Sequence, residues 1–162
     1  MGKIIYVEIG QVKAGSGKVI LQSKAIGSCV AIVAYDATKH IGALAHVMLP
    51  GKAPASKKGA EKTKYAVNAI DAIVSKMARL GSTGADIKVA VLGGANVLER
   101  QDDTICESNI KSTIEHLKKK HLEIVGEATG GTGRRNVWLD IDEGTIYYTE
   151  GDGGKRQLWP RQ

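Results

Sequence analysis

Residues 23–50 read SKAIGSCVAIVAYDATKHIGALAHVMLP and set the architecture of the first half of the chain. Two apolar runs, Cys29–Tyr35 and Ile41–Leu49, flank the short polar loop DATKH, and this pattern is typical of a β-hairpin. The first arm carries Cys29, one of two cysteines in the chain, and the second arm carries His46. The stretch therefore holds either a buried hairpin with an inert thiol or a nucleophile with its base.

Strand parity determines whether Cys29 and His46 can meet, because side chains alternate between the two faces of a strand. We take Asp36 to pair with Ile41 across the loop. Cys29 then lies opposite Met48, and His46 is its diagonal neighbour on the same face. A register shifted by one residue would point the two side chains to opposite faces, and a bulge in the second arm would also change the pairing.

If the two side chains meet, the imidazole takes the thiol proton, and the resulting imidazolium holds the nucleophilic thiolate. Gly27 and Ser28 allow a tight turn just before Cys29, and backbone N–H groups there are candidates for an oxyanion site. No acidic residue is close by in the first arm, so the Ser23 hydroxyl is the local candidate to orient His46. Spacing alone leaves the inert alternative open, because cysteine is commonly a small buried hydrophobe.

The rest of the chain predicts a mixed α/β fold. Further short strands are expected at Ile4–Ile9, Val19–Gln22, Ile87–Leu92, Leu122–Gly126, Val137–Ile141 and Thr145–Tyr148, with a turn at Gln11–Lys18. Helical spacing of apolar residues predicts one helix within Gly59–Leu80, closed by Gly81, and another from about Cys106 to Lys120. We therefore expect helices packed on a mixed, largely antiparallel sheet.

Composition bounds the class of protein. With 43% hydrophobic residues the chain can bury one core, so we expect a single domain over residues 1–162, its core at about 4–150 and a polar, loosely ordered tail from Gly151. No apolar run approaches the roughly 20 residues of a membrane span, and two cysteines without a secretory signal favour a cytoplasmic protein. The formal charge of +6 is most simply a solvated lysine-rich surface, and with 4% aromatic residues nucleic-acid binding is not expected.

Four motifs in order are more specific than this spacing: GSCVAIVAYD, GALAHVMLP, VAVLGGANVL and TGGTGRRNVWLD. Together they resemble CheD, the family of chemoreceptor glutamine deamidases in chemotaxis systems, and the resemblance runs from roughly Ile4 to Tyr148. It implies a layered α/β sandwich. It also implies distant kinship with the catalytic domain of cytotoxic necrotizing factor toxins, which deamidate glutamine with a cysteine and a histidine.

The resemblance implies roles for particular residues. The family nucleophile, the cysteine of GSC, matches Cys29, and the histidine of AHxMLP matches His46. The third catalytic member in the family is a threonine six residues before the cysteine, where this chain has Ser23, a hydroxyl without the methyl that stiffens threonine. Many members also carry Gly-Glu-Arg-Asn where this chain has CESN at 106–109, and only the Glu and Asn match. We therefore assign no function to Cys106 and expect it to be a packed or partly exposed helix residue.

Glycine-rich loops are expected near the site, because glycine lets the backbone approach a substrate closely. The residues concerned are Gly93, Gly94, Asn96, Gly130, Gly131 and Arg134. Ordinary turn chemistry is the alternative explanation for these segments. A phosphate-binding loop fits poorly, since Gly17-Lys18 is followed by Val19 where that motif needs Ser or Thr.

The implied activity is conversion of receptor glutamines to glutamate through a thioester on Cys29, and the same acyl chemistry allows a methylesterase side activity. No metal or organic cofactor is expected. The implied partners are the cytoplasmic helices of chemoreceptors, toward which a basic rim of Lys52, Lys57 and Lys58 would steer the protein, and a CheC-type chemotaxis phosphatase. The alternative is that the chain acts mainly as a binding regulator of such a phosphatase.

Overall fold

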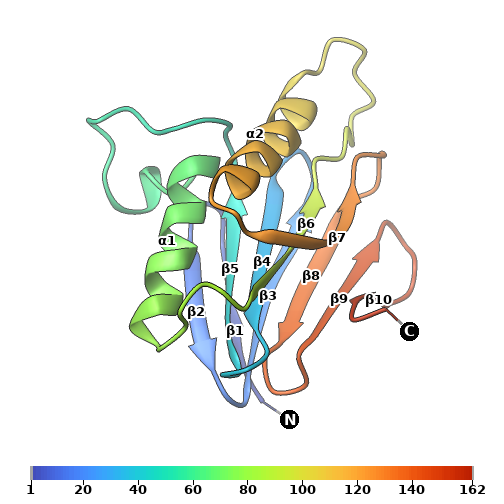
Figure 1. Ribbon diagram of the computed structural model, residues 1–162. Coiled ribbons are helices and arrows are strands. Elements are labelled where there is room, and N and C mark those ends of the chain that lie inside the picture. The colour runs from blue at the N-terminus through green and yellow to red at the C-terminus, as the bar shows by residue number, and fades with distance from the viewer. Residues whose placement is uncertain (1, 162) are drawn as a thin grey trace.

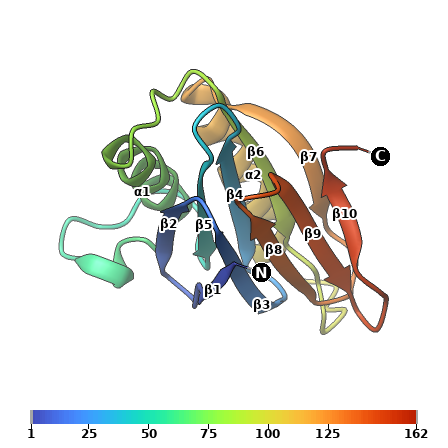
Figure 2. The ribbon, with the colours of Figure 1, turned by 90° about the horizontal axis from the view of Figure 1, so that it is seen from below.

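The structure, a computed structural model, describes residues 2–161 as three stacked layers (Figures 1 and 2). The strands are β1 (Lys3–Tyr6), β2 (Val12–Ser16), β3 (Val19–Ile26), β4 (Val30–Asp36), β5 (Ile41–Val47), β6 (Ile87–Gly93), β7 (Glu123–Thr129), β8 (Arg135–Asp140), β9 (Thr145–Glu150) and β10 (Arg156–Trp159). The helices are α1 (Ala66–Arg79) and α2 (Ile105–Lys119).

The described residues form two five-stranded sheets where we expected one. The middle layer has strand order β2-β5-β4-β6-β7, and the outer layer has strand order β1-β3-β8-β9-β10. Helices α1 and α2 lie together on the face of the middle sheet that points away from the outer sheet (Figure 2). Most strand pairs are antiparallel, with β1–β3 and β6–β7 parallel. The expected layered α/β architecture, mixed and largely antiparallel, is confirmed.

The hairpin of β4 and β5 forms in the predicted register. Asp36 pairs with Ile41, and this register places His46 opposite Ala31. Both strands are buried along their full length, because they lie inside the middle sheet between β2 and β6. Burial on both faces explains why the two runs are continuously apolar instead of alternating with polar residues.

Alternation along the hairpin separates two cores. The side chains of β4 that face the helices are Val30, Ile32 and Ala34. Those that face the outer sheet are Ala31, Val33 and Tyr35. Cys29 packs against this second core, and His46 has the same parity as Leu44, which belongs to it. Cys29 and His46 therefore lie on the face between the sheets.

Two expectations at the N-terminal half are wrong. Residues 12–16, expected within a turn, form β2 and pair with β5 up to Ser16 opposite Ile41. Gly15 lies within this edge strand, opposite Gly42, whereas Gly17, with a φ of 69°, forms the turn that the sequence indicated, between β2 and β3. Strand β3 continues past the expected Gln22 to Ile26 through an irregularity in its pairing with β8, where Ala25 adopts a positive φ of 55°.

The helix and tail expectations also need correction. Helix α1 begins only at Ala66, because residues 59–61 form a short 3-10 turn. Its end is as predicted, with Gly81 at a φ of 110° after the last turn. The tail beyond Gly151 is not loose, since residues 156–159 add β10 to the edge of the outer sheet beside β9.

Close stacking of the sheets constrains Gly42 on β5. A Cβ atom at this position would lie 2.5 Å from Leu139 Cδ2 and 3.0 Å from Ile141 Cγ1 on the outer sheet. We predict that Gly42→Ala lowers the free energy of unfolding by about 1–3 kcal/mol, because the added methyl group forces the sheets apart. Thermal and urea unfolding measure the change, with Gly154→Ala as the control, since a Cβ there meets nothing within 4 Å. Equal stability of the two variants would contradict the tight stacking.

Candidate active site

Ser23 and His46 belong to different sheets and meet between them. Ser23 lies on β3 and His46 on β5, and Ser23 Oγ is 2.8 Å from His46 Nδ1. Only 1% of Ser23 and 3% of His46 is exposed. The side-chain contact expected from sequence is therefore present, although spacing did not indicate that it would join two sheets.

Hydrogen bonding at Ser23 fixes the tautomer of His46. The single hydroxyl proton of Ser23 goes to the carbonyl oxygen of Val7, 2.7 Å away, because a carbonyl can only accept. Ser23 Oγ is left to accept from His46, so the proton of the neutral ring is on Nδ1. The lone pair is then on Nε2, which is buried and has no hydrogen-bond partner among residues 2–161. His46 is thus held in the form that takes a proton at Nε2.

The segment 7–11 encloses His46 with backbone groups. Gly10 N–H donates to the His46 carbonyl at 2.9 Å, and His46 N–H donates to the Gln11 carbonyl at 3.2 Å. Burial lowers the pKa of His46, and the nearby Glu8 carboxylate opposes this with a smaller upward effect on that pKa. Sequence reasoning missed this segment, because EIGQ at 8–11 carries no catalytic motif.

Cys29 is half-buried and lines a pocket of about 400 Å³. Most of the residues that line the pocket come from the loop before β4, the loop after β6 and the turn between β7 and β8. These three segments lie at the same end of the sheets (Figure 1). Other residues that line the pocket are Gly27, Ser28, Leu98, Arg100, Asp103 and Arg134. Gly27, Ser28 and Arg134 therefore line the same pocket as Cys29, whereas Lys52, Lys57 and Lys58 do not line it.

The loop before β4 is held by its carbonyl groups. Its three hydrogen bonds run from Ala95 N–H to Gly27 O (2.9 Å), from Gly94 N–H to Cys29 O (2.8 Å) and from Asn109 Nδ2 to Ser28 O (3.0 Å). The backbone N–H groups of Gly27, Ser28 and Cys29 have no acceptor within residues 2–161. A turn with fixed carbonyls and unoccupied N–H groups is suited to bind an oxyanion.

The glycine-rich segments brace this loop from behind. Gly130 N–H donates to the Gly93 carbonyl, and Asn96 N–H donates to the Gly131 carbonyl, both at 2.9 Å. Gly93 has a φ of 112°, and a Cβ atom there would lie 2.4 Å from the Cys29 carbonyl oxygen, so this close approach requires glycine. The expected loop residues that do not line the pocket are Gly93, Gly94, Asn96, Gly130 and Gly131.

Burial sets the resting charge of the pair. It raises the pKa of the Cys29 thiol and lowers the pKa of the His46 imidazole, and both shifts favour the uncharged forms. No hydrogen bond joins the two side chains in the described part of the chain. The structure thus favours an uncharged thiol at Cys29 and a neutral imidazole at His46, where the sequence suggested a thiolate held by an imidazolium.

Cys106 is a packed helix residue, as expected. Its Sγ lies 3.4 Å from both the Ala95 carbonyl oxygen and Asp103 Oδ2. Burial, with a further contribution from the Asp103 carboxylate, raises the pKa of this thiol to about 11. A thiol with so high a pKa is a poor nucleophile at neutral pH.

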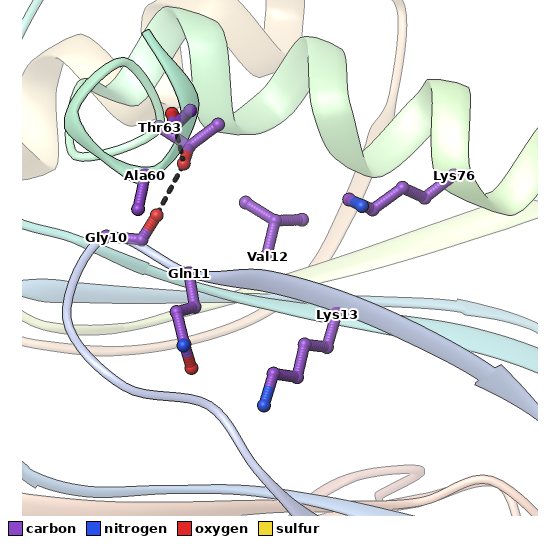
Figure 3. Close-up of a pocket in the computed structure, with 8 residues that line it drawn as sticks. Gly10, Gln11, Val12, Lys13, Ala60, Thr63 and Lys76 are labelled. Atoms are coloured by element: carbon purple, nitrogen blue, oxygen red, sulfur yellow. Dashed lines mark hydrogen bonds between the residues drawn. The ribbon is translucent and has the colours of Figure 1, made fainter.

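A second hollow, of about 390 Å³, lies between β2 and the segment that precedes α1 (Figure 3). The Thr63 hydroxyl donates to the Gly10 carbonyl across one end of it, and Lys76 of α1 lies at the other end (Figure 3). Cys29, His46 and Ser23 do not line this hollow.

Within residues 2–161, no helix has the length and apolar character to cross a membrane.

Comparison with known proteins assigns the chain to a family. Residues 48–150 match the family model described as CheD chemotactic sensory transduction. A protein of Chlorobium luteolum named probable chemoreceptor glutamine deamidase CheD is 36% identical over 146 residues, 90% of this chain and 72% of the relative. The chain belongs to the CheD family. A CheD relative of the same name from Pyrococcus abyssi is 30% identical over 96% of both chains. The chemoreceptor glutamine deamidase CheD of Thermotoga maritima is 28% identical over 93% of this chain and 94% of the relative.

The uncharged resting pair predicts how Cys29 reacts with iodoacetamide. In a Cys106→Ser background, the alkylation rate is expected to be low at pH 6 and to keep rising with pH beyond the ordinary thiol range, because burial raises the pKa of Cys29. Mass spectrometry of quenched samples measures the rate at each pH. A plateau already reached near pH 6 would instead show a preformed ion pair.

Proposed function

We propose that this CheD-family protein deamidates glutamine side chains of chemotaxis receptors through a cysteine thioester. The observation that carries the proposal is the buried Ser23–His46 hydrogen bond, which leaves Nε2 of His46 free to take a proton. Cys29 shares the inter-sheet face with His46 and opens into a pocket. Relatives of this chain are named chemoreceptor glutamine deamidases or probable ones, which supports receptor glutamine as the substrate.

The first half of the reaction forms the thioester. The Cys29 thiol gives its proton to His46 Nε2 while sulfur bonds to the carboxamide carbon of the glutamine, whose oxygen becomes an oxyanion. The protonated Nε2 then gives its proton to the nitrogen, the C–N bond breaks and ammonia leaves. General acid–base help of this kind is typically worth about 10²–10⁴ in rate.

The second half of the reaction regenerates the enzyme. Water loses a proton to neutral His46 and attacks the thioester carbon, the C–S bond breaks, and the proton returns to Cys29. Glutamate remains on the receptor. A methyl-glutamate ester presents the same acyl carbon with methanol as leaving group, so methylesterase activity belongs to the same proposal. No step in this sequence calls for a metal or an organic cofactor.

Stabilisation of the oxyanion is assigned to the loop before β4. The N–H groups of Ser28 and Cys29 have no acceptor in the described chain and belong to residues that line the pocket. One such donor is typically worth about 10²–10³ in rate. A cysteine, a histidine and a backbone oxyanion site are also what kinship with cytotoxic necrotizing factor catalytic domains would require, and we propose that kinship on this ground.

The pocket surroundings suit a receptor helix as substrate. Arg100 and Arg134 line the pocket and favour acidic segments, and Leu98, 68% exposed, offers an apolar contact beside them. We assign the steering role to these arginines, since Lys52, Lys57 and Lys58 do not line the pocket. The same surface is available to a CheC-type phosphatase, and binding such a partner is the alternative role. Both partners place the protein in the cytoplasm, where receptor signalling helices lie.

Substitution of the nucleophile tests the function directly. A receptor cytoplasmic fragment incubated with the wild-type protein should gain about one dalton for each glutamine converted to glutamate, and the Cys29→Ala variant should convert none, because the thioester cannot form. Intact-mass analysis gives the count and peptide mapping gives the positions.

The control for this experiment is Cys106→Ser, which removes the other thiol and should retain conversion. Absence of conversion by the folded wild-type protein with several receptors would overturn the deamidase. If Cys29→Ala still altered the activity of a CheC-type phosphatase, the binding role would stand apart from catalysis.

The serine position gives a graded prediction. Ser23→Ala removes the acceptor for His46 Nδ1, so the ring loses its fixed tautomer, and the rate should fall by less than the roughly 10²–10⁴ expected for loss of the base itself. Ser23→Thr keeps the hydroxyl and should retain most of the rate. Steady-state ammonia release measures both variants, and a Ser23→Ala rate equal to that of wild type would remove the orienting role.

A further inference from the structure

Asn109, in the helix layer, is hydrogen-bonded both to the loop that carries Cys29 and to the chain just after His46. It lies in the second turn of α2, and its side chain is fully buried. Its Nδ2 atom is 3.0 Å from the Ser28 carbonyl oxygen and 3.1 Å from the Met48 carbonyl oxygen. Ser28 directly precedes the nucleophile, and Met48 follows His46 by two residues. One amide group thus joins the loop before β4 to the end of β5.

The orientation of this amide is fixed by its partners. Both partners are carbonyl oxygens, which only accept, so the group between them must be the NH₂ with its two donors. The opposite orientation would place three oxygens together without a proton. The side chain therefore acts as a two-pronged donor, and no aspartate could replace it at neutral pH without repulsion between its carboxylate and both carbonyl groups.

The bond to Ser28 acts on Cys29 through the peptide plane. The carbonyl of Ser28 and the N–H of Cys29 belong to one rigid, planar peptide unit, in which the two groups point in opposite directions. Holding the carbonyl toward α2 directs the Cys29 N–H away from α2. A donor on the carbonyl also polarises the same peptide and strengthens its N–H as a hydrogen-bond donor.

The bond to Met48 holds the open end of the hairpin. The last residue pair of the β4–β5 ladder is Val30 with Val47, so Cys29 and Met48 lie just beyond the paired region. The loop is held by the N–H groups of residues 94 and 95, and Met48 N–H is bonded to the Lys64 carbonyl, but none of these bonds ties the two segments directly to each other. Asn109 supplies that tie, because the same Nδ2 atom reaches both sides.

We propose that Asn109 is a positioning residue that directs the Cys29 N–H toward the oxyanion of the deamidation reaction. The inference rests on the proposed function and deepens it, since it states which side chain prepares the oxyanion site. The two hydrogen bonds of Asn109 go to backbone carbonyl oxygens, so its proposed effect on the reacting atoms is indirect. Its effect passes through the Ser28–Cys29 peptide and is confined to reactions that build negative charge on a carbonyl oxygen.

The test compares two reactions of the same thiol in Asn109→Asp and Asn109→Ala. Deamidation of a receptor fragment forms an oxyanion, whereas alkylation of Cys29 by iodoacetamide displaces iodide at a saturated carbon and forms none. We expect kcat for deamidation to fall by about tenfold to a hundredfold, less than the roughly 10²–10³ for a lost donor. The alkylation rate of Cys29, measured in a Cys106→Ser background, should stay unchanged in Asn109→Ala, which is the variant used to compare the two reactions, because the carboxylate of Asn109→Asp also disfavours the thiolate.

Thr113→Val is the matched control. Thr113 lies one turn further along α2, is fully buried, and its hydroxyl has no hydrogen-bond partner within residues 2–161. Both of its rates should equal those of the wild type, and thermal unfolding should show all variants folded at the assay temperature. Asn109→Ala adds no charge and keeps the test valid if Asn109→Asp is unfolded.

Each outcome decides the matter. A fall in deamidation alone supports the proposal. An equal fall in deamidation and alkylation would overturn it, because Asn109 would then merely support the fold of the loop. Unchanged rates in both variants would also overturn it. If wild-type protein alkylates but converts no receptor glutamine, the proposed function fails, and this inference fails with it. Failure of the proposed function can be told apart from failure of this inference alone, because it is seen in the wild-type protein without any variant.

Discussion

Stacking of the two sheets is the constraint on which the candidate site depends, because Ser23 and His46 lie in different sheets and are hydrogen-bonded across the gap. The gap is narrow enough at Gly42 to exclude a single methyl group. A hydrogen bond of 2.8 Å between buried side chains tolerates little relative movement of the layers. The packing that sets the distance between the sheets therefore also sets the orientation of the His46 ring.

Burial also determines the resting charge of Cys29 and His46. A histidine and a cysteine enclosed between sheets both favour their neutral forms. Such a site avoids holding an ion pair in the absence of substrate, and its thiol is correspondingly less open to oxidation at rest. In the proposed reaction the charges arise only when the carboxamide is attacked, and stabilisation of the oxyanion is assigned to fixed backbone dipoles. The rate of the proposed reaction would therefore depend more strongly on the geometry of the loop before β4 than it would at a site with a preformed thiolate.

The sequence predicts the hairpin well because one physical signal controls it. Two continuous apolar runs around DATKH determine both the pairing of Asp36 with Ile41 and the shared face of Cys29 and His46. Ser23 is indicated both by its place near the hairpin and by the motif resemblance, and the loop residues Gly27, Ser28 and Arg134 lie at the pocket. The family assignment is confirmed by the comparisons.

The features that the sequence did not predict depend on long-range contacts. They are the edge strand β2, the added strand β10 and the division into two sheets, each of which is decided by strand partners far away in the chain. Asn109 carried one faint signal, a polar residue on the buried side of a helix.

The N-terminal segment runs from β1 in the outer sheet to β2 in the middle sheet and back to β3 in the outer sheet, and residues 10 and 11, between β1 and β2, are hydrogen-bonded to His46. The Val7 carbonyl accepts the hydrogen bond from the Ser23 hydroxyl, and the backbones of Gly10 and Gln11 are hydrogen-bonded to the backbone of His46. A fragment that began after Gln11 would keep the cysteine, the histidine, the serine and every motif of the family. It would nevertheless lack the acceptor that decides which nitrogen of the histidine is basic. Motif content is thus an incomplete criterion for judging whether a CheD homologue, a gene fusion or a shortened reading frame retains a working site.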